Sequence, residues 1–194
     1  MATALYPEYI HGIFERQCEI APRNLALYKE AVGDRIDIIF ISGTDFGVQD
    51  RSFISVDAYR TLYKPYHKRI NDWVHANTNW KTFYHSCGAI TAYLDDMVEA
   101  GVDIINPVQI SAAGMDPADL KARWGDQLVF WGGGVDTQQV LPFGRPDEVA
   151  ANVAGNIAVL DDGGGMVISA AHNIQALIPA ENLRALANAW ITRG

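Results

Sequence analysis

The chain has 194 residues, of which 49% are hydrophobic and 20% charged, a composition that excludes an intrinsically disordered protein and allows a sizeable core. Fifteen lysines and arginines against 23 aspartates and glutamates leave a net charge of -8. This acidic balance argues against nucleic acid and against an anionic membrane surface as partners. Because no apolar run approaches the roughly 18 residues of a membrane-spanning helix, we expect a soluble, cytoplasmic protein.

The first part of the chain is predicted to contain two long helices. Over residues 7–32 apolar residues recur every three or four positions, which predicts a helix that Pro22 bends or divides. A second helix is expected over residues 56–76. Ser55 is its predicted N-cap, and Pro65 predicts a bend within it.

Strands alternate with helices along the rest of the chain. An apolar, β-branched run at residues 36–41 predicts a first strand that is buried on both faces. Further strands are expected at residues 81–85, 102–107, 128–131 and 166–170, and further helices at residues 90–100, 116–124, 146–160 and 179–190. This alternation predicts an α/β fold with about five parallel strands. We expect one domain over residues 1–194, with an N-terminal helical segment at residues 1–33.

Polar side chains gather where each predicted strand ends. They are Asp45 after the first strand, His85 and Cys87 at the second, Asn106 and Gln109 after the third, Asp136 and Gln138 after the fourth, and His172 and Gln175 after the fifth. The carboxyl ends of parallel strands meet at one edge of a sheet, where ligands bind in α/β proteins. These residues therefore predict a small-molecule binding site at that edge.

The segment His85-Ser86-Cys87 is the most specific local motif. At the end of a strand, side chains two residues apart point to the same side, so an imidazole and a thiol can bind one ion. Zinc suits this pair of ligands, and His172 is the histidine placed to supply a third. The alternative is that Cys87 packs as a small apolar group and His85 as a hydrogen-bonded pocket histidine.

Two aspartates each allow two interpretations. Asp45 is a candidate oxygen ligand or general acid/base, but the residues alone favour a turn residue that bonds its own backbone. Asp136, which follows three glycines at 132–134, has the same two interpretations. The glycines lack the lysine of a P-loop and the spacing of a dinucleotide fingerprint, so they indicate a tight turn or room for a bulky ligand.

Several motifs together carry a resemblance to a known family. They are Phe83-Tyr84-His85-Ser86-Cys87-Gly88, Gly101-Val102-Asp103 with Asn106-Pro107-Val108-Gln109, Phe130-Trp131-Gly132-Gly133 with Asp136-Thr137-Gln138, and Ala171-His172-Asn173-Ile174-Gln175 followed by Pro179-Ala180-Glu181-Asn182. In this order they resemble the uroporphyrinogen decarboxylase superfamily, which also contains cobalamin-dependent methyltransferases. The likeness runs from about Asp45 to the C-terminus.

The resemblance implies a (β/α)8 barrel, of which this chain is the C-terminal portion, since a complete barrel needs about 250 residues and eight strands. Its methyltransferase branch implies zinc bound by His85, Cys87 and a third ligand at His172, with an acidic ligand near Asp45. In that branch the zinc activates a thiol for methyl transfer with a corrinoid.

Two other functions stay open at this point. The chain resembles a tetrapyrrole decarboxylase at His172, and its polar residues would then line a porphyrinogen pocket without a metal. Alternatively, it is a truncated, non-catalytic half-barrel subunit, because the arginines and the essential aspartate of the decarboxylases have no counterpart here. An open half-barrel exposes strand edges, so we expect a homodimer or a complementing subunit, and independent enzymatic activity is undecided.

Overall fold

The structure, a computed structural model, describes residues 2–192 and forms two compact units. Unit 1 comprises the residues up to Ser42 together with Phe53–Tyr84 and Ala92–Asp103. Unit 2 comprises Gly43–Ser52, His85–Thr91 and the residues from Ile104 onward. The chain passes between the units several times, so each unit is built from segments that are distant in sequence. The outermost residues of the expected domain, 1 and 193–194, lie outside the described residues.

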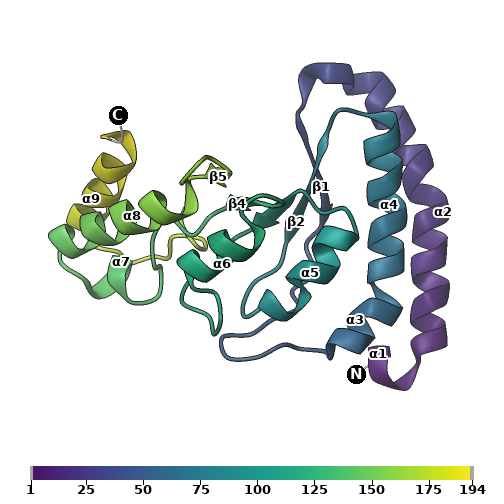
Figure 1. The fold of residues 1–194 in the computed structure, drawn as a ribbon, viewed down its shortest axis with the longest axis horizontal. Helices are drawn as coiled ribbons and strands as arrows, with labels where there is room; N and C mark the ends of the chain where they lie inside the picture. The colour runs from purple at the N-terminus through teal and green to yellow at the C-terminus, as the bar shows by residue number, and fades with distance from the viewer. Residues whose placement is uncertain (1, 193–194) are drawn as a thin grey trace. The chain divides into compact units, whose positions relative to one another are not determined.

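Unit 1 consists mainly of helices, which Figure 1 labels. They are α1 (Ala2–Leu5), α2 (Pro7–Val32), the 3-10 helix η1 (Gly33–Arg35), α3 (Val56–Leu62), α4 (Lys64–Asn77) and α5 (Thr91–Glu99). The strands β1 (Ile38–Ser42) and β2 (Lys81–His85) pair in parallel. The last residue of β2 and the first residue of α5 belong to unit 2.

Helix α2 is continuous, so Pro22 does not divide it. A proline in a helix interior lacks the N–H for the usual backbone hydrogen bond. Helices α2 and α4 lie side by side (Figure 1), and Phe14 packs against Tyr63 and Tyr66 with ring centroids 5.2 and 5.4 Å apart. This packing holds the first half of α2 against α4. Among the described helices, none is both long and apolar enough to cross a membrane.

The second predicted helix is observed as two helices, α3 and α4, which meet at Tyr63. Pro65 lies in the first turn of α4, where a helix does not need the missing N–H. The expected bend is therefore a complete break. The prediction for Ser55 is confirmed, because its hydroxyl oxygen accepts a hydrogen bond of 3.1 Å from the backbone N–H of Ala58.

Strand β1 corrects one expectation, because it is not buried on both faces. Phe40, at its centre, is 60% exposed, and its neighbours in the strand are only half-buried. The Phe40 ring contacts the ring of Phe83 on β2, with centroids 5.7 Å apart. An apolar sequence indicates the propensity to form a strand, but it does not establish that other segments cover both of its faces.

Unit 2 contains the remaining elements: β3 (Ile104–Asn106), α6 (Pro117–Trp124), β4 (Val129–Trp131), α7 (Val140–Phe143), α8 (Pro146–Leu160), β5 (Met166–Val167) and α9 (Ala180–Ile191). Strand β4 pairs in parallel with β3 and with β5. Each of the five strands thus has a parallel neighbour, and the predicted α/β fold class is confirmed. The strands β3 and β5 are shorter than expected, and Pro107 and Ser169, which follow them, line a cavity.

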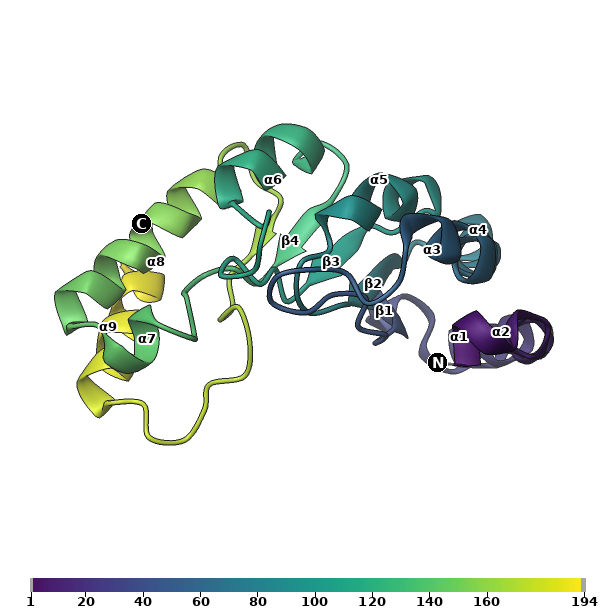
Figure 2. The same cartoon turned by 90° about the horizontal axis from the view of Figure 1, so that it is seen from below.

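The core of unit 2 joins its last three helices, α7, α8 and α9 (Figure 2). Val149, Val153 and Ile157 recur every four residues along α8 and are buried against Leu141 of α7 and Leu186 of α9. Burying each aliphatic side chain contributes roughly 1.5–3 kcal/mol. Helix α7 was not expected from the sequence, because its four residues are too few to show a helical period.

A buried histidine in unit 1 predicts a loss of stability in acid. Burial lowers the pKa of His67 to about 4, whereas the unfolded chain titrates near 6.5. Between these values only the unfolded state takes up the proton, so the free energy of unfolding falls as the pH falls from about 6.5 towards 4. For this residue alone the loss between pH 7.5 and pH 5 is about 2 kcal/mol.

Urea unfolding at both pH values measures this loss. We expect His67→Gln, whose amide can keep the 3.2 Å contact with the Tyr59 hydroxyl, to show a pH dependence that is smaller by about 2 kcal/mol. An unchanged pH dependence in the variant would contradict the assignment to His67.

Candidate metal centre

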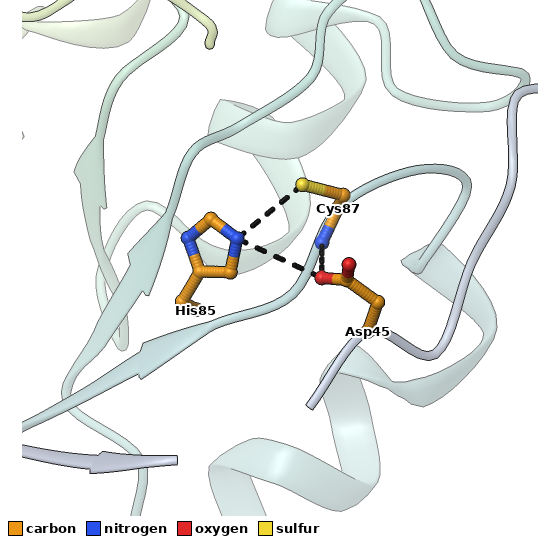
Figure 3. Close-up of side chains that lie close together, drawn as sticks. All are labelled: Asp45, His85 and Cys87. Atoms are coloured by element: carbon orange, nitrogen blue, oxygen red, sulfur yellow. Dashed lines mark hydrogen bonds and ion pairs between the residues drawn. The ribbon is translucent and has the colours of Figure 1, made fainter. Parts of the chain in front are cut away.

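Three side chains of unit 2 form a compact cluster of metal-binding atoms. Asp45 lies in the loop after β1, His85 ends β2, and Cys87 follows two residues later (Figure 3). One ligand atom from each residue lies within 4.8 Å of the other two. The structure thus brings together two residues of the predicted zinc site, His85 and Cys87, with the candidate oxygen ligand Asp45.

The distances within the cluster fit a tetrahedral zinc site. Nε2 of His85 is 3.3 Å from Sγ of Cys87 and 3.6 Å from Oδ1 of Asp45. Zinc binds nitrogen and oxygen at about 2.1 Å and sulfur at about 2.3 Å, so tetrahedral ligand atoms lie about 3.5 Å apart. The three donors therefore need little movement to share one ion.

Asn106 fixes the orientation and the tautomer of His85. The Asn106 amide nitrogen donates to the carbonyl oxygen of Trp131 at 3.0 Å, which leaves its Oδ1 facing Nδ1 of His85 at 2.6 Å. Nδ1 must therefore carry the proton and donate it to Asn106. The lone pair is then on Nε2, which points towards Cys87 and Asp45, as a metal ligand requires.

The Cys87 thiol is protonated at neutral pH in the absence of a cation. Partial burial and the nearby Asp45 carboxylate raise its pKa to about 11. The thiol can then donate to Nε2 of His85, which accounts for the 3.3 Å contact. A raised pKa does not suit a cysteine nucleophile, and a bound cation would lower the pKa of the thiol so that it could act as a ligand.

Asp45 bonds to a different loop from its own. Its Oδ1 accepts a hydrogen bond of 2.8 Å from the backbone N–H of Cys87. This bond places the carboxylate beside the His85–Cys87 pair. Of the two interpretations of Asp45, the geometry therefore supports the oxygen ligand.

Two glycines, Gly47 and Gly88, allow the Asp45 loop and the Cys87 loop to lie close together, a role that the sequence does not reveal. Gly88 has a φ of +83°, and a Cβ added to it would lie 2.6 Å from the backbone oxygens of Gly47 and Val48. The backbone N–H of Ala89 donates to the Val48 oxygen at 2.8 Å, and the Ser86 hydroxyl accepts from the backbone N–H of Phe46 at 3.0 Å. Only glycines allow this close backbone approach.

A group of glutamines supports the same loops. Gln49 accepts hydrogen bonds at 2.8 and 2.9 Å from the side chains of Gln109 and Gln138, two of the predicted substrate-binding residues. Gln109 in turn accepts from the backbone N–H of Gly88 at 3.0 Å. Gln49 follows the first predicted strand, as the other polar residues of this edge follow theirs, but the sequence does not show which side chains it bonds.

Asp136 adopts the turn conformation that was one of its two interpretations. Its Oδ1 accepts hydrogen bonds from the backbone N–H groups of Gln138 and Gln139 at 2.7 and 3.1 Å. Its own backbone N–H donates to the side chain of Asn152. A role of Asp136 in substrate binding stays a prediction.

His172 lines two cavities beside the cluster without being part of it. The first, of about 460 Å³, is also lined by His85 and Asn106, and the second, of about 300 Å³, by Gln109, Gln138 and Gln175. Among the described residues, Asp45 and not His172 completes the group of clustered ligand atoms. The role of His172 as a zinc ligand therefore stays a prediction, as does that of Gln175 in substrate binding.

The close approach of the loops predicts that Gly88→Ala weakens metal binding and lowers the melting temperature. Its side chain would meet the backbone of Gly47 at a φ that costs other residues about 1–3 kcal/mol. Gly155→Ala is the matched control, because Gly155 lies in α8 with open space around it. Zinc affinity measured by chelator competition should be unchanged in the control, and equal affinities in both variants would contradict the expectation.

The orienting role of Asn106 predicts that Asn106→Ala weakens zinc binding by about 10- to 100-fold, as loss of such partners does elsewhere. Asn106→Asp should recover part of the affinity, because a carboxylate also accepts from Nδ1 although it loses the hydrogen bond to the Trp131 carbonyl oxygen. Asn173 lines the same cavity, so Asn173→Ala is the control and should bind zinc with normal affinity. Unchanged affinity in Asn106→Ala, measured by the same competition, would show that the tautomer does not depend on this amide.

Comparison with known proteins agrees with the resemblance seen in the sequence. The family described as Uroporphyrinogen decarboxylase (URO-D) matches residues 28–192, whereas no curated protein matches the chain. Among solved structures, a methyltransferase from Methanosarcina mazei has a similar fold, with a TM-score of 0.53 and 21% sequence identity. The match covers 79% of this chain but only 41% of that protein, so this chain spans less than half its length. The chain belongs to the uroporphyrinogen decarboxylase family.

Proposed function

We propose that this chain is the zinc-binding part of a methyltransferase-like protein that transfers a methyl group between a corrinoid and a thiol. The observation that carries the proposal is the cluster of Asp45, His85 and Cys87, with Nε2 of His85 at 3.3 Å from the sulfur and 3.6 Å from the carboxylate. An imidazole, a thiolate and a carboxylate together suit zinc better than magnesium or calcium, which prefer oxygen ligands alone.

The similar fold of a protein named as a methyltransferase supports this choice within the family. At 21% identity the likeness concerns the fold, so the activity rests on the cluster. A three-ligand site with one position left open is typical of catalytic zinc. Bound zinc would supply a Lewis acid that favours the thiolate form of an incoming thiol.

The chain's own residues would prepare this site in three ways. Asn106 keeps the lone pair of His85 directed at the cluster through its 2.6 Å bond to Nδ1. Asp45 and a deprotonated Cys87 carry one negative charge each, which together balance the charge of a divalent cation. The adjoining cavity, lined by His85 and His172, leaves room beside the cluster for a thiol.

The corrinoid is proposed as a substrate or as a cofactor carried by a partner. Because the chain spans 41% of the similar methyltransferase, we expect complete turnover only when the rest of a barrel is supplied. Binding of zinc and of a thiol can be tested on the chain alone.

Zinc binding predicts one equivalent of the metal in protein purified without a histidine tag. His85→Ala and Cys87→Ala should each lose it, whereas Cys18→Ala and His75→Ala, which alter the other cysteine and a histidine of unit 1, should retain it. With Co²⁺ in place of zinc, the thiolate-to-cobalt absorption band should disappear in Cys87→Ala and persist in Cys18→Ala. Equal metal content in all four variants would rule out the site.

Co²⁺-loaded protein shows whether Asp45 or His172 is the third metal ligand, and whether an added thiol binds to the metal. Asp45→Asn should weaken metal binding more than His172→Ala does, and the reverse order would assign the third position to His172. A simple thiol such as 2-mercaptoethanol should strengthen the thiolate band. A spectrum unchanged at saturating thiol would contradict the methyltransferase proposal, and decarboxylation of uroporphyrinogen by metal-free protein would favour the decarboxylase.

A further inference from the structure

The second cavity beside the metal centre, of about 300 Å³, is lined mainly by side-chain amides and is called the amide cavity here. Its lining residues are Gln109, Thr137, Gln138, His172, Asn173 and Gln175. No lysine, arginine, aspartate or glutamate is among the described residues that line it. An amide both donates and accepts hydrogen bonds, so this lining favours a ligand group that does the same and carries no charge.

The amide cavity adjoins the cavity that reaches the metal centre. His172 and Asn173 line both cavities, and the metal-binding candidate His85 lines the other one. All of these residues belong to unit 2. A ligand whose reacting atom lies at the cluster can therefore extend a peripheral group into the amide cavity.

A series of hydrogen bonds fixes the orientation of the glutamine side chains. The amide nitrogen of Gln49 donates to the backbone oxygen of Ser111, which leaves its Oε1 to accept from Nε2 of Gln109 and of Gln138. The Oε1 atom of Gln109 accepts from the backbone N–H of Gly88. A backbone carbonyl only accepts and a backbone N–H only donates, so turning either Gln49 or Gln109 round would lose hydrogen bonds.

Two oxygen atoms of the lining are left as acceptors without a donor. Gln138 and Gln175 each donate through Nε2, to Gln49 and to the backbone oxygen of Asn173 respectively. Within the part of the chain that the structure describes, the Oε1 atoms of these two residues accept no hydrogen bond. A ligand group that satisfies them must donate, as a primary carboxamide does and an ionised carboxylate cannot.

We propose that the amide cavity binds peripheral carboxamide side chains of the corrinoid and rejects the carboxylate side chains of a porphyrinogen. This inference rests on the proposed function, in which a corrinoid carries the methyl group. A corrinoid bears neutral acetamide and propionamide groups around its ring, whereas uroporphyrinogen bears acetates and propionates. At about 300 Å³ the cavity is at the lower end of the range for ligand pockets, so it takes side chains while the ring stays outside.

The rejection of carboxylates follows from what the cavity lacks. A carboxylate that leaves water needs a cation or several donors, and here it would face the acceptor atoms of Gln138 and Gln175. A site built from hydrogen-bonding groups discriminates strongly against a ligand that cannot pair with them. The amide cavity therefore separates the two tetrapyrrole classes by the end groups of their side chains.

Equilibrium dialysis of the zinc-free full chain against two corrinoids tests the cavity. Dicyanocobinamide has carboxamide side chains and dicyanocobyrinic acid has carboxylates in their place. Cyanide fills both axial positions of the cobalt in each, so no histidine or thiol of the protein can bind the cobalt. We expect the cobinamide to bind at least about 10-fold more tightly. Equal affinities, tighter binding of the acid, or no binding of the cobinamide would overturn the proposal.

The variant Gln138→Lys distinguishes the cavity from the net charge of -8 as the source of this preference. Its ammonium group can still donate to Oε1 of Gln49, but a cation replaces the acceptor, so dicyanocobyrinic acid should bind about 10-fold more tightly than to the wild type. Gln139→Lys is the matched control, because it adds the same charge one residue away on a side chain that does not line the cavity. An equal effect of both substitutions would contradict the assignment to the cavity.

A second variant, Gln175→Lys, tests the cavity independently of the bond between Gln138 and Gln49. It should shift the preference towards the acid in the same direction, and no shift in either lysine variant would overturn the proposal. Zinc content, measured without cyanide, should equal that of the wild type in both. A wild-type chain that prefers the cobinamide but binds no zinc would contradict the proposed zinc chemistry alone, whereas bound zinc with equal corrinoid affinities would contradict the amide cavity alone.

Discussion

The hydrogen bond from the backbone N–H of Cys87 to Asp45 joins loops whose residues are 42 positions apart in sequence, and the metal centre depends on it. The bond is possible only because Gly47 and Gly88 let the two backbones come close. A side chain at either glycine would separate the carboxylate from the sulfur. The ligand set is thus determined by backbone packing as much as by the ligands themselves.

The ligands of the cluster and the groups that orient them lie at the ends of different strands of the parallel sheet. Asp45 follows β1, His85 ends β2, its partner Asn106 ends β3, and Asn106 is held by the carbonyl oxygen of Trp131 at the end of β4. Each side chain in this series fixes the next. Hydrogen bonds to the other side of a ligating side chain orient it towards the metal. The hydrogen bonds of the chain itself therefore hold His85 in the orientation that a metal ligand needs.

The sequence was sufficient for the number and order of the strands and for the His85–Cys87 pair, because the alternation of strands with helices and a two-residue spacing are local patterns. It did not reveal that Asn106 orients His85 or that Gln49 supports Gln109, since such contacts depend on the register between strands. The exposure of Phe40 was missed for a related reason. An apolar run records the propensity of a strand, whereas burial depends on which neighbours are present.

In the proposed zinc site the ion, and not the protein, would generate the thiolate, because the pKa of Cys87 is raised. Burial and the Asp45 carboxylate both disfavour the negatively charged form of the Cys87 sulfur. The carboxylate and the thiolate would both attract a cation. Because an ordered site binds the ion only in the folded state, binding also stabilises the fold, by about 2.7 kcal/mol at an ion concentration of 100 times the dissociation constant. Deprotonation of Cys87 costs free energy, which the attraction of the proposed ion for the thiolate and for the Asp45 carboxylate would have to exceed.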